Sequence, residues 1–263
     1  MTAGVAPEFK VVIPARYGSR RLPCKPLLSI GGKPMIAHVC ERALASGATD
    51  VAVATDDERI RRAVDELGVH AVMTRLDHNS GTERIAEVAD ICGWNPTDLI
   101  VNVQGDEPLI PPALIQRVAA ALAGQSRAGM ATLATPIDDY DEVSNPNVVK
   151  VVPDRLGYAL YFSRAPVPWD RERFGRGVLE PGDGMTWLRH IGLYAYTVGF
   201  LRRYIDWPVS PLESVESLEQ LRILWNGEPI YVTCVTDAPP AGIDTDADLL
   251  RVTRLLSGDS LVE

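Results

Sequence analysis

Short apolar runs alternate with amphipathic stretches through the first half of the chain. Buried strands are predicted at residues 9–14, 50–55, 69–74 and 98–103. Helices are predicted at residues 34–46, 57–67, 82–92 and 112–123. This alternation is typical of βαβ units, in which helices cover a parallel sheet. We therefore expect an α/β fold with a mixed, mostly parallel sheet and helices on both faces.

The second half of the chain has a different pattern. Strands are predicted at residues 148–152, 158–164 and 190–198, and no long helix separates the first two. We therefore expect an antiparallel elaboration over about residues 136–211, including a glycine-rich loop at 175–184. A helix at 211–225, a strand at 230–235 and a helix at 246–256 complete the pattern. Because no composition break marks a linker, we expect one domain over residues 9–256, with flexible tails at 1–8 and 257–263.

Composition excludes several classes of protein. The 263 residues are 46% hydrophobic and 23% charged, as in soluble globular proteins. With 26 basic and 35 acidic residues the net charge is −9, which argues against a nucleic-acid scaffold but allows a small anionic substrate. The chain shows neither a membrane-spanning apolar run nor a secretory signal, and its four cysteines lack C-x-x-C spacing. We expect a cytoplasmic protein with free thiols and no membrane insertion.

A cationic loop follows the first predicted strand. Four basic residues lie within ten positions of this acidic chain: Arg16, Arg20, Arg21 and Lys25. Neither the dinucleotide-binding nor the Walker glycine pattern is present. Pro23 and Pro26 restrict the backbone on either side of Lys25. A stiff cationic loop at the end of a parallel strand suits a triphosphate. The alternative is a solvated basic loop.

Two aspartates are candidate metal ligands. Asp106 follows the strand at 98–103 through Gln104 and Gly105, at the carboxyl end where α/β folds gather ligands. Asp244 follows the strand at 230–235. Mg²⁺ usually takes one or two protein carboxylates and completes its shell with phosphate oxygens and water. The alternative is that each aspartate only shapes a turn beside a glycine.

Ordered blocks of sequence run from residue 9 to about residue 256. They include ARYGSRRLPCKPL (15–27), HNSGTER (78–84), VNVQGDEP (101–108), NPNVVKVV (145–152), YFSR (161–164), RHIG (189–192), LEQLR (218–222) and GIDT (242–245). Together these blocks resemble the sugar-acid cytidylyltransferases, and most closely the 3-deoxy-manno-octulosonate (Kdo) cytidylyltransferases. The resemblance implies a nucleotide-diphospho-sugar transferase fold and a Mg²⁺-dependent homodimer. It also implies transfer of CMP from CTP to the anomeric hydroxyl of Kdo, releasing pyrophosphate, for lipopolysaccharide precursor synthesis.

The same resemblance implies roles for individual residues. The implied catalytic residues are Arg16, Lys25, Asp106 and Asp244, with Asp106 and Asp244 as metal ligands. The implied CTP-binding residues are Arg16, Ser19, Arg21, Lys25, Arg75, Ser80 and Gln104. The implied sugar-acid-binding residues are Arg164, His190, Tyr194, Glu219 and Gln220.

Residue chemistry supports part of this second set. Arg164, at a strand end, can clamp a carboxylate, and Glu219 is expected on the buried edge of the helix at 211–225. His190 and Tyr194 are expected to face the same side of a strand. The alternatives are structural: Arg75 pairs with Asp77, Glu219 pairs with Arg222, and His190 is a hydrogen-bonded core residue.

Two departures and two alternative functions stay open. Cys24 stands where the resemblance leads us to expect glycine, and Arg20 stands where it leads us to expect threonine. The chain could act on another 2-keto sugar acid, such as a sialic-acid-like substrate or an 8-amino analogue of Kdo. It could also be a catalytically silent nucleotide-binding protein, which the presence of Lys25, Asp106 and Asp244 argues against. A dimer interface is expected partly through 136–211, on the basis of three tryptophans there: Trp169, Trp187 and Trp207.

Overall fold

A computed structural model describes residues 6–18, 22–137, 139, 141–176, 187–237, 239–240 and 242–257. The chain divides into two compact units. The first unit comprises Met1–Ala120, Ala195–Ile205 and Pro239–Glu263, and the second comprises Ala121–Tyr194 and Asp206–Ala238. The tails at 1–5 and 258–263, and residues 177–184 of the predicted glycine-rich loop, lie outside the described residues. Cooperative folding as one domain stays a prediction.

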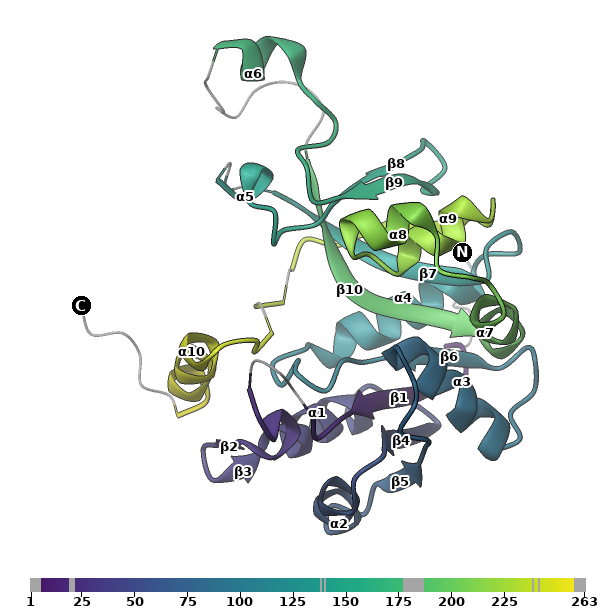
Figure 1. The fold of residues 1–263 in the computed structure, drawn as a ribbon, viewed down its shortest axis with the longest axis vertical. Helices are drawn as coiled ribbons and strands as arrows, with labels where there is room; N and C mark the ends of the chain where they lie inside the picture. The colour runs from purple at the N-terminus through teal and green to yellow at the C-terminus, as the bar shows by residue number, and fades with distance from the viewer. Residues whose placement is uncertain are drawn as a thin grey trace. The chain divides into compact units, whose positions relative to one another are not determined.

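The first unit contains a parallel sheet in the order β6–β1–β4–β5 (Figure 1). These strands are β1 (Lys10–Ala15), β4 (Asp50–Thr55), β5 (His70–Met73) and β6 (Leu99–Asn102). The register places Val11 opposite both Val51 and Val101, and the side chain of Val11 is fully buried. Continuous apolar runs such as VVI suit strands with both faces covered. The predicted α/β fold with a mostly parallel sheet is confirmed.

Helices of the first unit follow these strands. They are α1 (Met35–Leu44), α2 (Glu58–Asp65), α3 (Gly81–Ile91), α4 (Pro112–Ala123, which ends in the second unit), α7 (Val198–Ile205) and α10 (Asp246–Ser257). A 3-10 helix η1 (Lys25–Leu27) and a hairpin of β2 (Ser29–Ile30) and β3 (Lys33–Pro34) lie between β1 and α1. The sequence pattern missed α7, because β10 runs directly into it without a turn residue.

The second unit combines parallel and antiparallel pairs. Its strands are β7 (Met130–Pro136), β8 (Lys150–Pro153), β9 (Ala159–Ser163), β10 (Leu188–Thr197, whose last three residues belong to the first unit) and β11 (Ile230–Cys234). β11 pairs with β7 in parallel, whereas β8 pairs antiparallel with both β9 and β10. The expected antiparallel portion is therefore present. The sequence pattern missed β7, whose small residues (MATLATP) carry little strand signal although six of the seven are buried.

Four helices are described in the second unit: α5 (Asp141–Ser144), α6 (Arg171–Arg176), α8 (Pro211–Glu216) and α9 (Gln220–Trp225). The prediction of one continuous helix over 211–225 is wrong. Ser217 has a left-handed backbone with φ of 52° and ends α8, which Ser210 begins with a capping box to Glu213. Glu219 is exposed, as is Val215 (85%), so the expectation that Glu219 lies on a buried edge is also wrong.

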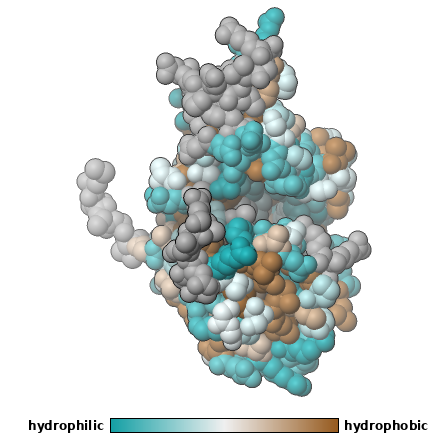
Figure 2. All heavy atoms as spheres, turned by 90° about the vertical axis from the view of Figure 1, so that its left-hand side faces the viewer, coloured by the Kyte–Doolittle hydropathy of each residue, from teal (hydrophilic) through white to brown (hydrophobic). Residues whose placement is uncertain are grey.

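The expected dimer interface stays a prediction, and the tryptophans on which it was based differ in exposure. Trp187 is buried, packs with Ile137 and Val143, and donates a hydrogen bond from Nε1 to the Pro168 carbonyl. Trp169 is 63% exposed and stacks on Phe174 with ring centroids 4.0 Å apart. Figure 2 shows one face of the molecule, on which hydrophobic residues reach the surface between hydrophilic ones. Within the described ranges, every helix is too short or too polar to cross a bilayer.

Candidate active site

Three charged residues from distant parts of the chain meet in the first unit. Lys25 lies at the start of η1, Asp106 follows β6, and Asp244 precedes α10. The Lys25 ammonium donates to Asp106 Oδ2 at 2.5 Å and to Asp244 Oδ1 at 3.0 Å. The sequence predicted each residue separately, and the structure brings the two aspartates to the same cation. Arg16 is exposed, and Ser19 and Arg21 lie outside the described residues.

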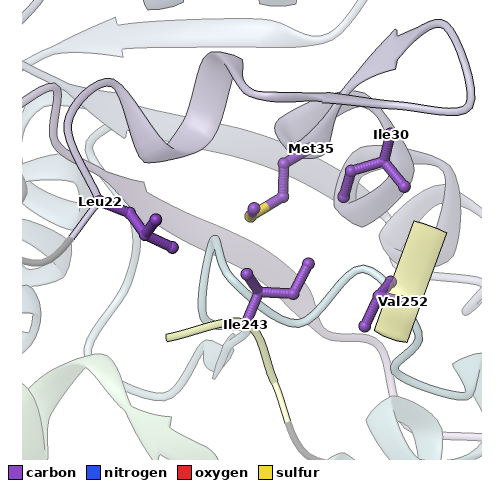
Figure 3. Close-up of a cluster of buried hydrophobic side chains, with 5 residues drawn as sticks. All are labelled: Leu22, Ile30, Met35, Ile243 and Val252. Atoms are coloured by element: carbon purple, nitrogen blue, oxygen red, sulfur yellow. The ribbon is translucent and has the colours of Figure 1, made fainter. Parts of the chain in front are cut away.

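The loop that carries Lys25 is held by its apolar neighbours. Leu22 is buried with Ile30, Met35, Ile243 and Val252, and Figure 3 shows these side chains converging on one cluster. Cys24 takes a left-handed backbone with φ of 58°, and its carbonyl accepts the Leu27 amide at 2.8 Å. That tight turn starts η1 and places Lys25 directly after it.

Two close backbone approaches position the aspartates. A Cβ on Gly105 would lie 2.9 Å from the Pro14 carbonyl oxygen, so glycine lets the segment after β6 pass close to β1. A Cβ on Gly242 would lie 3.0 Å from the Asp106 carbonyl oxygen. The Ile243 amide donates to that same carbonyl at 3.0 Å, while its side chain enters the cluster of Figure 3. Asp106 and Asp244 are therefore fixed relative to each other through their backbones.

The chemistry of this trio suits a divalent cation. One ammonium faces two carboxylates, which leaves a net charge of about −1. The side chains of Lys25, Asp106 and Asp244 are 13%, 34% and 48% exposed, so both carboxylates remain open to solvent. Among the described residues no group of three or more His, Cys, Asp or Glu could hold a metal. Two carboxylates fit Mg²⁺, which takes its other ligands from phosphates and water.

The candidate nucleotide-binding residues of the first unit make contacts with residues that are close to them in the sequence. Arg75 is exposed and pairs with exposed Asp77 at 3.2 Å, which is the structural alternative raised by the sequence. Ser80 is the N-cap of α3, where its hydroxyl accepts the Glu83 amide at 3.1 Å. Gln104 donates from Nε2 to Asn102 Oδ1 at 3.3 Å. These contacts are local and leave ligand roles for the three residues untested.

A buried polar network supports the segment from 74 to 80, and the sequence analysis did not single it out. Arg84 is fully buried and donates to Asp56 Oδ2 at 2.7 Å and to the Thr74 hydroxyl. Glu87 accepts the Arg75 amide at 3.0 Å and bonds to His78. Burial alone would raise the pKa of Glu87, but the hydrogen bonds from His78 and the Arg75 amide, together with the charges of those residues, outweigh it and lower the pKa. The sequence signal that could have revealed this network is the block HNSGTER, which contains His78 and Arg84.

In the second unit, Arg164 is tied to the backbone. Its guanidinium donates to the carbonyls of Glu216 at 2.7 Å, Pro146 at 2.9 Å and Ser217 at 3.4 Å. Glu216, which the sequence analysis missed, also accepts the Arg164 amide at 2.9 Å and the Ser163 hydroxyl at 2.6 Å. Arg164 therefore holds β9 to the junction of α8 and α9, and it remains partly exposed.

His190 is neutral at physiological pH. Burial lowers its pKa to about 3. Thr132 directs its hydroxyl at the carbonyls of Ile191 and Leu193, so His190 Nε2, 2.9 Å from that oxygen, is the donor. In a neutral ring the other nitrogen, Nδ1, is then an acceptor. The ring contacts Tyr194 with centroids 5.4 Å apart, as the same-face prediction requires.

Gln220 has a buried polar atom without a partner among the described residues. Its side chain is 4% exposed, and Nε2 makes no hydrogen bond to any described residue. Its Oε1 accepts the Tyr194 hydroxyl at 3.4 Å. An unsatisfied buried amide costs roughly 1–3 kcal/mol, so such a group marks a place where a ligand or water can bind. Glu219, the preceding residue, is exposed.

Glu213, an acidic residue of α8, is buried, unlike Glu219. Glu213 receives two hydrogen bonds from Arg222, at 2.6 and 2.7 Å, and both side chains are almost fully buried. Arg222 therefore pairs with Glu213, which the sequence analysis did not consider as its partner. The bidentate pair fixes α8 against α9 from the inside.

The chain is similar to known cytidylyltransferases along most of its length. A family model described as cytidylyltransferase matches residues 10–230. Relatives named 3-deoxy-manno-octulosonate cytidylyltransferase from Methylococcus capsulatus and Idiomarina loihiensis are 59% and 58% identical, over 95% and 96% of this chain and 98% and 99% of theirs. The relative of the same name from Tolumonas auensis is 59% identical over 95% of this chain and 97% of its own.

The chain belongs to the 3-deoxy-manno-octulosonate cytidylyltransferase family. A solved structure of a CMP:2-keto-3-deoxy-manno-octonic acid synthetase complexed with CTP has a TM-score of 0.87 and 42% identity. That match covers 97% of this chain and 100% of the other. As a member of this family the chain is a nucleotidyltransferase, and the fold predicted from the sequence blocks is confirmed.

Proposed function

We propose that this chain transfers CMP from CTP to the anomeric hydroxyl of Kdo. The sugar hydroxyl oxygen forms a bond to the α-phosphorus and releases its proton to solvent, the bond from that phosphorus to the bridging oxygen breaks, and pyrophosphate leaves. The observation that carries the proposal is identity of 58–59% along almost the whole chain to relatives named for this activity. The meeting of Lys25, Asp106 and Asp244 supports it from the structure.

The nucleotide roles are assigned to the first unit. Lys25 and Arg16, with Ser19 and Arg21 of the same loop, bind the triphosphate and neutralise its charge, which lets an oxygen nucleophile approach. Three further residues bind the rest of CTP: Arg75, Ser80 and Gln104. Gln104 offers both a donor and an acceptor to the base or ribose. Arg75 can leave its ion pair with Asp77 at little cost, because both side chains are more than two-thirds exposed.

Asp106 and Asp244 are proposed to hold Mg²⁺. Their convergence on one ammonium supports the assignment, because two carboxylates that share a cation can also share a metal. When bound, the metal would neutralise phosphate charge and orient the reacting groups. Lys25 then donates to phosphate oxygens in place of the two carboxylates. We assign no general base among the described residues of this cluster.

The sugar-acid site is assigned to the second unit. Arg164 supplies a cation for the carboxylate of Kdo, and its two remaining N–H groups are available after the three carbonyl contacts. His190 Nδ1 accepts from a hydroxyl, and Tyr194 packs beside it. The buried Nε2 of Gln220 donates to a sugar oxygen and so gains the partner that it lacks. Glu219, exposed at the start of α9, accepts hydroxyl hydrogens.

We further propose a setting for the reaction. A cytoplasmic homodimer would supply CMP-Kdo for lipopolysaccharide precursor synthesis. Exposed apolar side chains of the second unit offer material for a dimer contact: Leu160 (64% exposed), Trp169 (63%) and Val215 (85%). Light scattering at micromolar concentration tests this: a particle of twice 28.7 kDa supports the dimer, and one of 28.7 kDa contradicts it.

Pyrophosphate release tests the function directly. The enzyme is supplied with each of four nucleoside triphosphates, and each is combined with Kdo, an 8-amino Kdo analogue and a sialic acid. Release with CTP and Kdo at the highest kcat/KM supports the proposal. Preference for another sugar acid would keep the cytidylyltransferase and replace the substrate. Absence of release with every pair would favour a silent nucleotide-binding protein.

A further inference from the structure

A fully buried lysine lies at the centre of the second unit's polar cluster. Lys150 is 0% exposed on β8. Its ammonium donates to the carbonyls of Val148 at 2.5 Å, Arg164 at 2.6 Å and Asn145 at 3.0 Å. All three of its donors are thereby satisfied by neutral backbone oxygens. Burial lowers the pKa of Lys150, while the charge of Glu216 opposes that shift.

The three acceptors belong to segments that also contact Arg164. Residues 145–148 form the loop that leads into β8, and Lys150 holds this loop through its first and last carbonyls. Arg164 donates to the carbonyl between them, that of Pro146, at 2.9 Å. Lys150 and Arg164 therefore donate hydrogen bonds to the same loop, and Lys150 also fixes the backbone of Arg164 itself. Loss of Lys150 would release both ends of this arrangement.

The same cluster reaches the end of α8. Glu216 binds the Ser163 hydroxyl and the Arg164 amide, and its carbonyl accepts from the Arg164 guanidinium. Ser217, next in the chain, also accepts from Arg164. Gln220 follows three residues later. These contacts thus connect Lys150 through Arg164 to the residues that lead into α9, whose Gln220 has a buried amide nitrogen without a partner among the described residues.

The charges of this cluster do not cancel. Lys150 and Arg164 contribute two positive charges, and Glu216 contributes one negative charge, so the sum is about +1. Burying a lysine against neutral carbonyls is costly, because desolvation of the ammonium is offset only by hydrogen bonds. An apolar residue of similar volume would avoid the desolvation of a charge but would leave the three carbonyls without their donor. A lysine is favoured at such a position if an anion binds nearby.

We propose that Lys150 is a positioning residue of the sugar-acid site, which fixes Arg164 and residues 145–148 and makes the site select a carboxylate. The inference rests on the proposed function. Lys150 does not contact the substrate. It acts through Arg164, whose guanidinium it orients, and through a buried positive charge that a substrate carboxylate would balance.

The test separates selection of a carboxylate from general stability. Lys150→Met removes the charge and the donors, whereas Lys150→Gln removes the charge and keeps two donors. The probe is the carboxamide of Kdo, which is neutral, used as a competitive inhibitor beside the natural acid. KM for Kdo should rise about 10- to 100-fold in Lys150→Met, with KM for CTP changed less than about twofold. Preference for the acid over the amide should fall about tenfold in both variants.

Two control variants bracket the result. Lys33→Met makes the same chemical change at an exposed lysine that pairs with Glu41. Tyr158→Phe removes a hydrogen bond to Gln125 within the second unit and lowers stability without touching this cluster. Both should keep the acid-to-amide preference of the unchanged enzyme. Thermal unfolding of every variant identifies those that are folded at the assay temperature.

Each outcome decides the proposal. An unchanged acid-to-amide preference in folded Lys150 variants would overturn it, as would loss of the folded state in both variants, which assigns Lys150 to folding alone. Equal loss of preference in Tyr158→Phe would overturn it too. If the unchanged enzyme transferred no CMP to Kdo, the proposed function would fail first, and that result is visible before any variant is made.

Discussion

Lys25 in the first unit and Lys150 in the second both satisfy their ammonium groups within the chain, but with different kinds of partner. Lys25 binds two side-chain carboxylates, Asp106 and Asp244, which are 34% and 48% exposed. Lys150 binds three backbone carbonyls and is fully buried. A carboxylate side chain can rotate and take another cation, whereas a backbone carbonyl moves only with its segment. The first arrangement suits exchange of ligands, and the second suits a fixed shape.

The two clusters also differ in net charge. The Lys25 cluster sums to about −1 and the Lys150 cluster, with Arg164 and Glu216, to about +1. A site of the first kind attracts a metal ion, and one of the second kind attracts a carboxylate. The two substrates of the proposed reaction, a metal-bound triphosphate and a sugar acid, therefore match clusters of opposite charge and opposite rigidity.

The largest expected effect concerns the exchangeable cluster. Asp106→Asn and Asp244→Asn should each lower kcat roughly 100- to 1,000-fold, because one metal ligand and its charge are lost. Steady-state kinetics at saturating Mg²⁺ and CTP measure this. Asp65→Asn, which alters an exposed ion pair with Arg61, should leave kcat within about twofold. Near-normal turnover in both aspartate variants would show that the cluster does not hold the catalytic metal.

The two lysines should differ most in stability without ligand. Lys150→Met should lower the free energy of unfolding by about 2–4 kcal/mol, because three buried carbonyls lose their donor. Lys25→Met should lower it by less than about 1 kcal/mol, because water screens the exposed aspartates. Urea denaturation without Mg²⁺ or CTP makes the comparison. If Lys25→Met proved as destabilising as Lys150→Met, the distinction between exchangeable and fixed clusters would fail.

Lys25→Met should also change the response to the metal alone. With Lys25 absent, Asp106 and Asp244 face each other without a cation, so added Mg²⁺ should stabilise the variant more than the unchanged chain. Thermal unfolding with and without millimolar Mg²⁺, in the absence of CTP, measures the difference. An equal shift in both proteins would mean that Lys25 and the metal do not compete for the same carboxylates.

Much of the first unit could be predicted from sequence, and much of the second could not. The strand at 50–55 and the helix at 112–123 have the predicted bounds, because each begins and ends at strong local signals. β7 was missed because alanine and threonine dominate it, and burial decides its conformation. The helix at 211–225 was predicted as continuous because Ser217 carries no local sign of a left-handed backbone.

The same contrast applies to the site residues. Lys25, Asp106 and Asp244 each follow a strand or a proline-bounded turn, so position in the fold identified them. The supports of the second cluster act through backbone carbonyls, and no sequence pattern reports which carbonyl a side chain will reach. Glu216 therefore went unnoticed, and the wrong face was assigned to Glu219. Arg164 was named, but its contacts with Pro146, Glu216 and Ser217 depend on tertiary structure.

A pH titration should distinguish the second unit by a smaller effect. The folded-state pKa of His190 is lowered from 6.5 to about 3, so between these pH values the unfolded chain binds a proton on His190 and the folded chain does not. The contribution of neutral His190 to the free energy of unfolding is complete above pH 6.5 and is lost as pH falls from 6.5 toward 3. At pH 5 the loss is about 2 kcal/mol. Urea denaturation at pH 8 and pH 5 measures the free energy of unfolding at each pH. Its decrease between pH 8 and pH 5 should be about 2 kcal/mol smaller in His190→Gln than in the unchanged chain. Identical pH dependence would mean that His190 titrates normally.

The smallest expected effect compares one backbone position in each unit. Cys24, beside Lys25, and Ser217, beside the Arg164 contacts, both have left-handed backbones, with φ of 58° and 52°. A residue with a Cβ costs about 1–2 kcal/mol there, and glycine gives back about 0.5–1 kcal/mol through its unfolded-state freedom. Cys24→Gly and Ser217→Gly should therefore each be about 0.5–1 kcal/mol more stable than the alanine variant at the same position.

Alanine is the right reference for both positions because it isolates the backbone term. Cys24→Ala and Cys24→Gly both remove the thiol that hydrogen-bonds to Tyr17, and Ser217→Ala and Ser217→Gly both keep the carbonyl that binds Arg164. The difference within each pair then reports the cost of the left-handed conformation alone. Equal gains in the two units would show that both clusters carry the same local strain. A gain only at Ser217 would indicate that the Lys25 loop relaxes without ligand, as an exchangeable cluster can, while the Arg164 cluster is held in place.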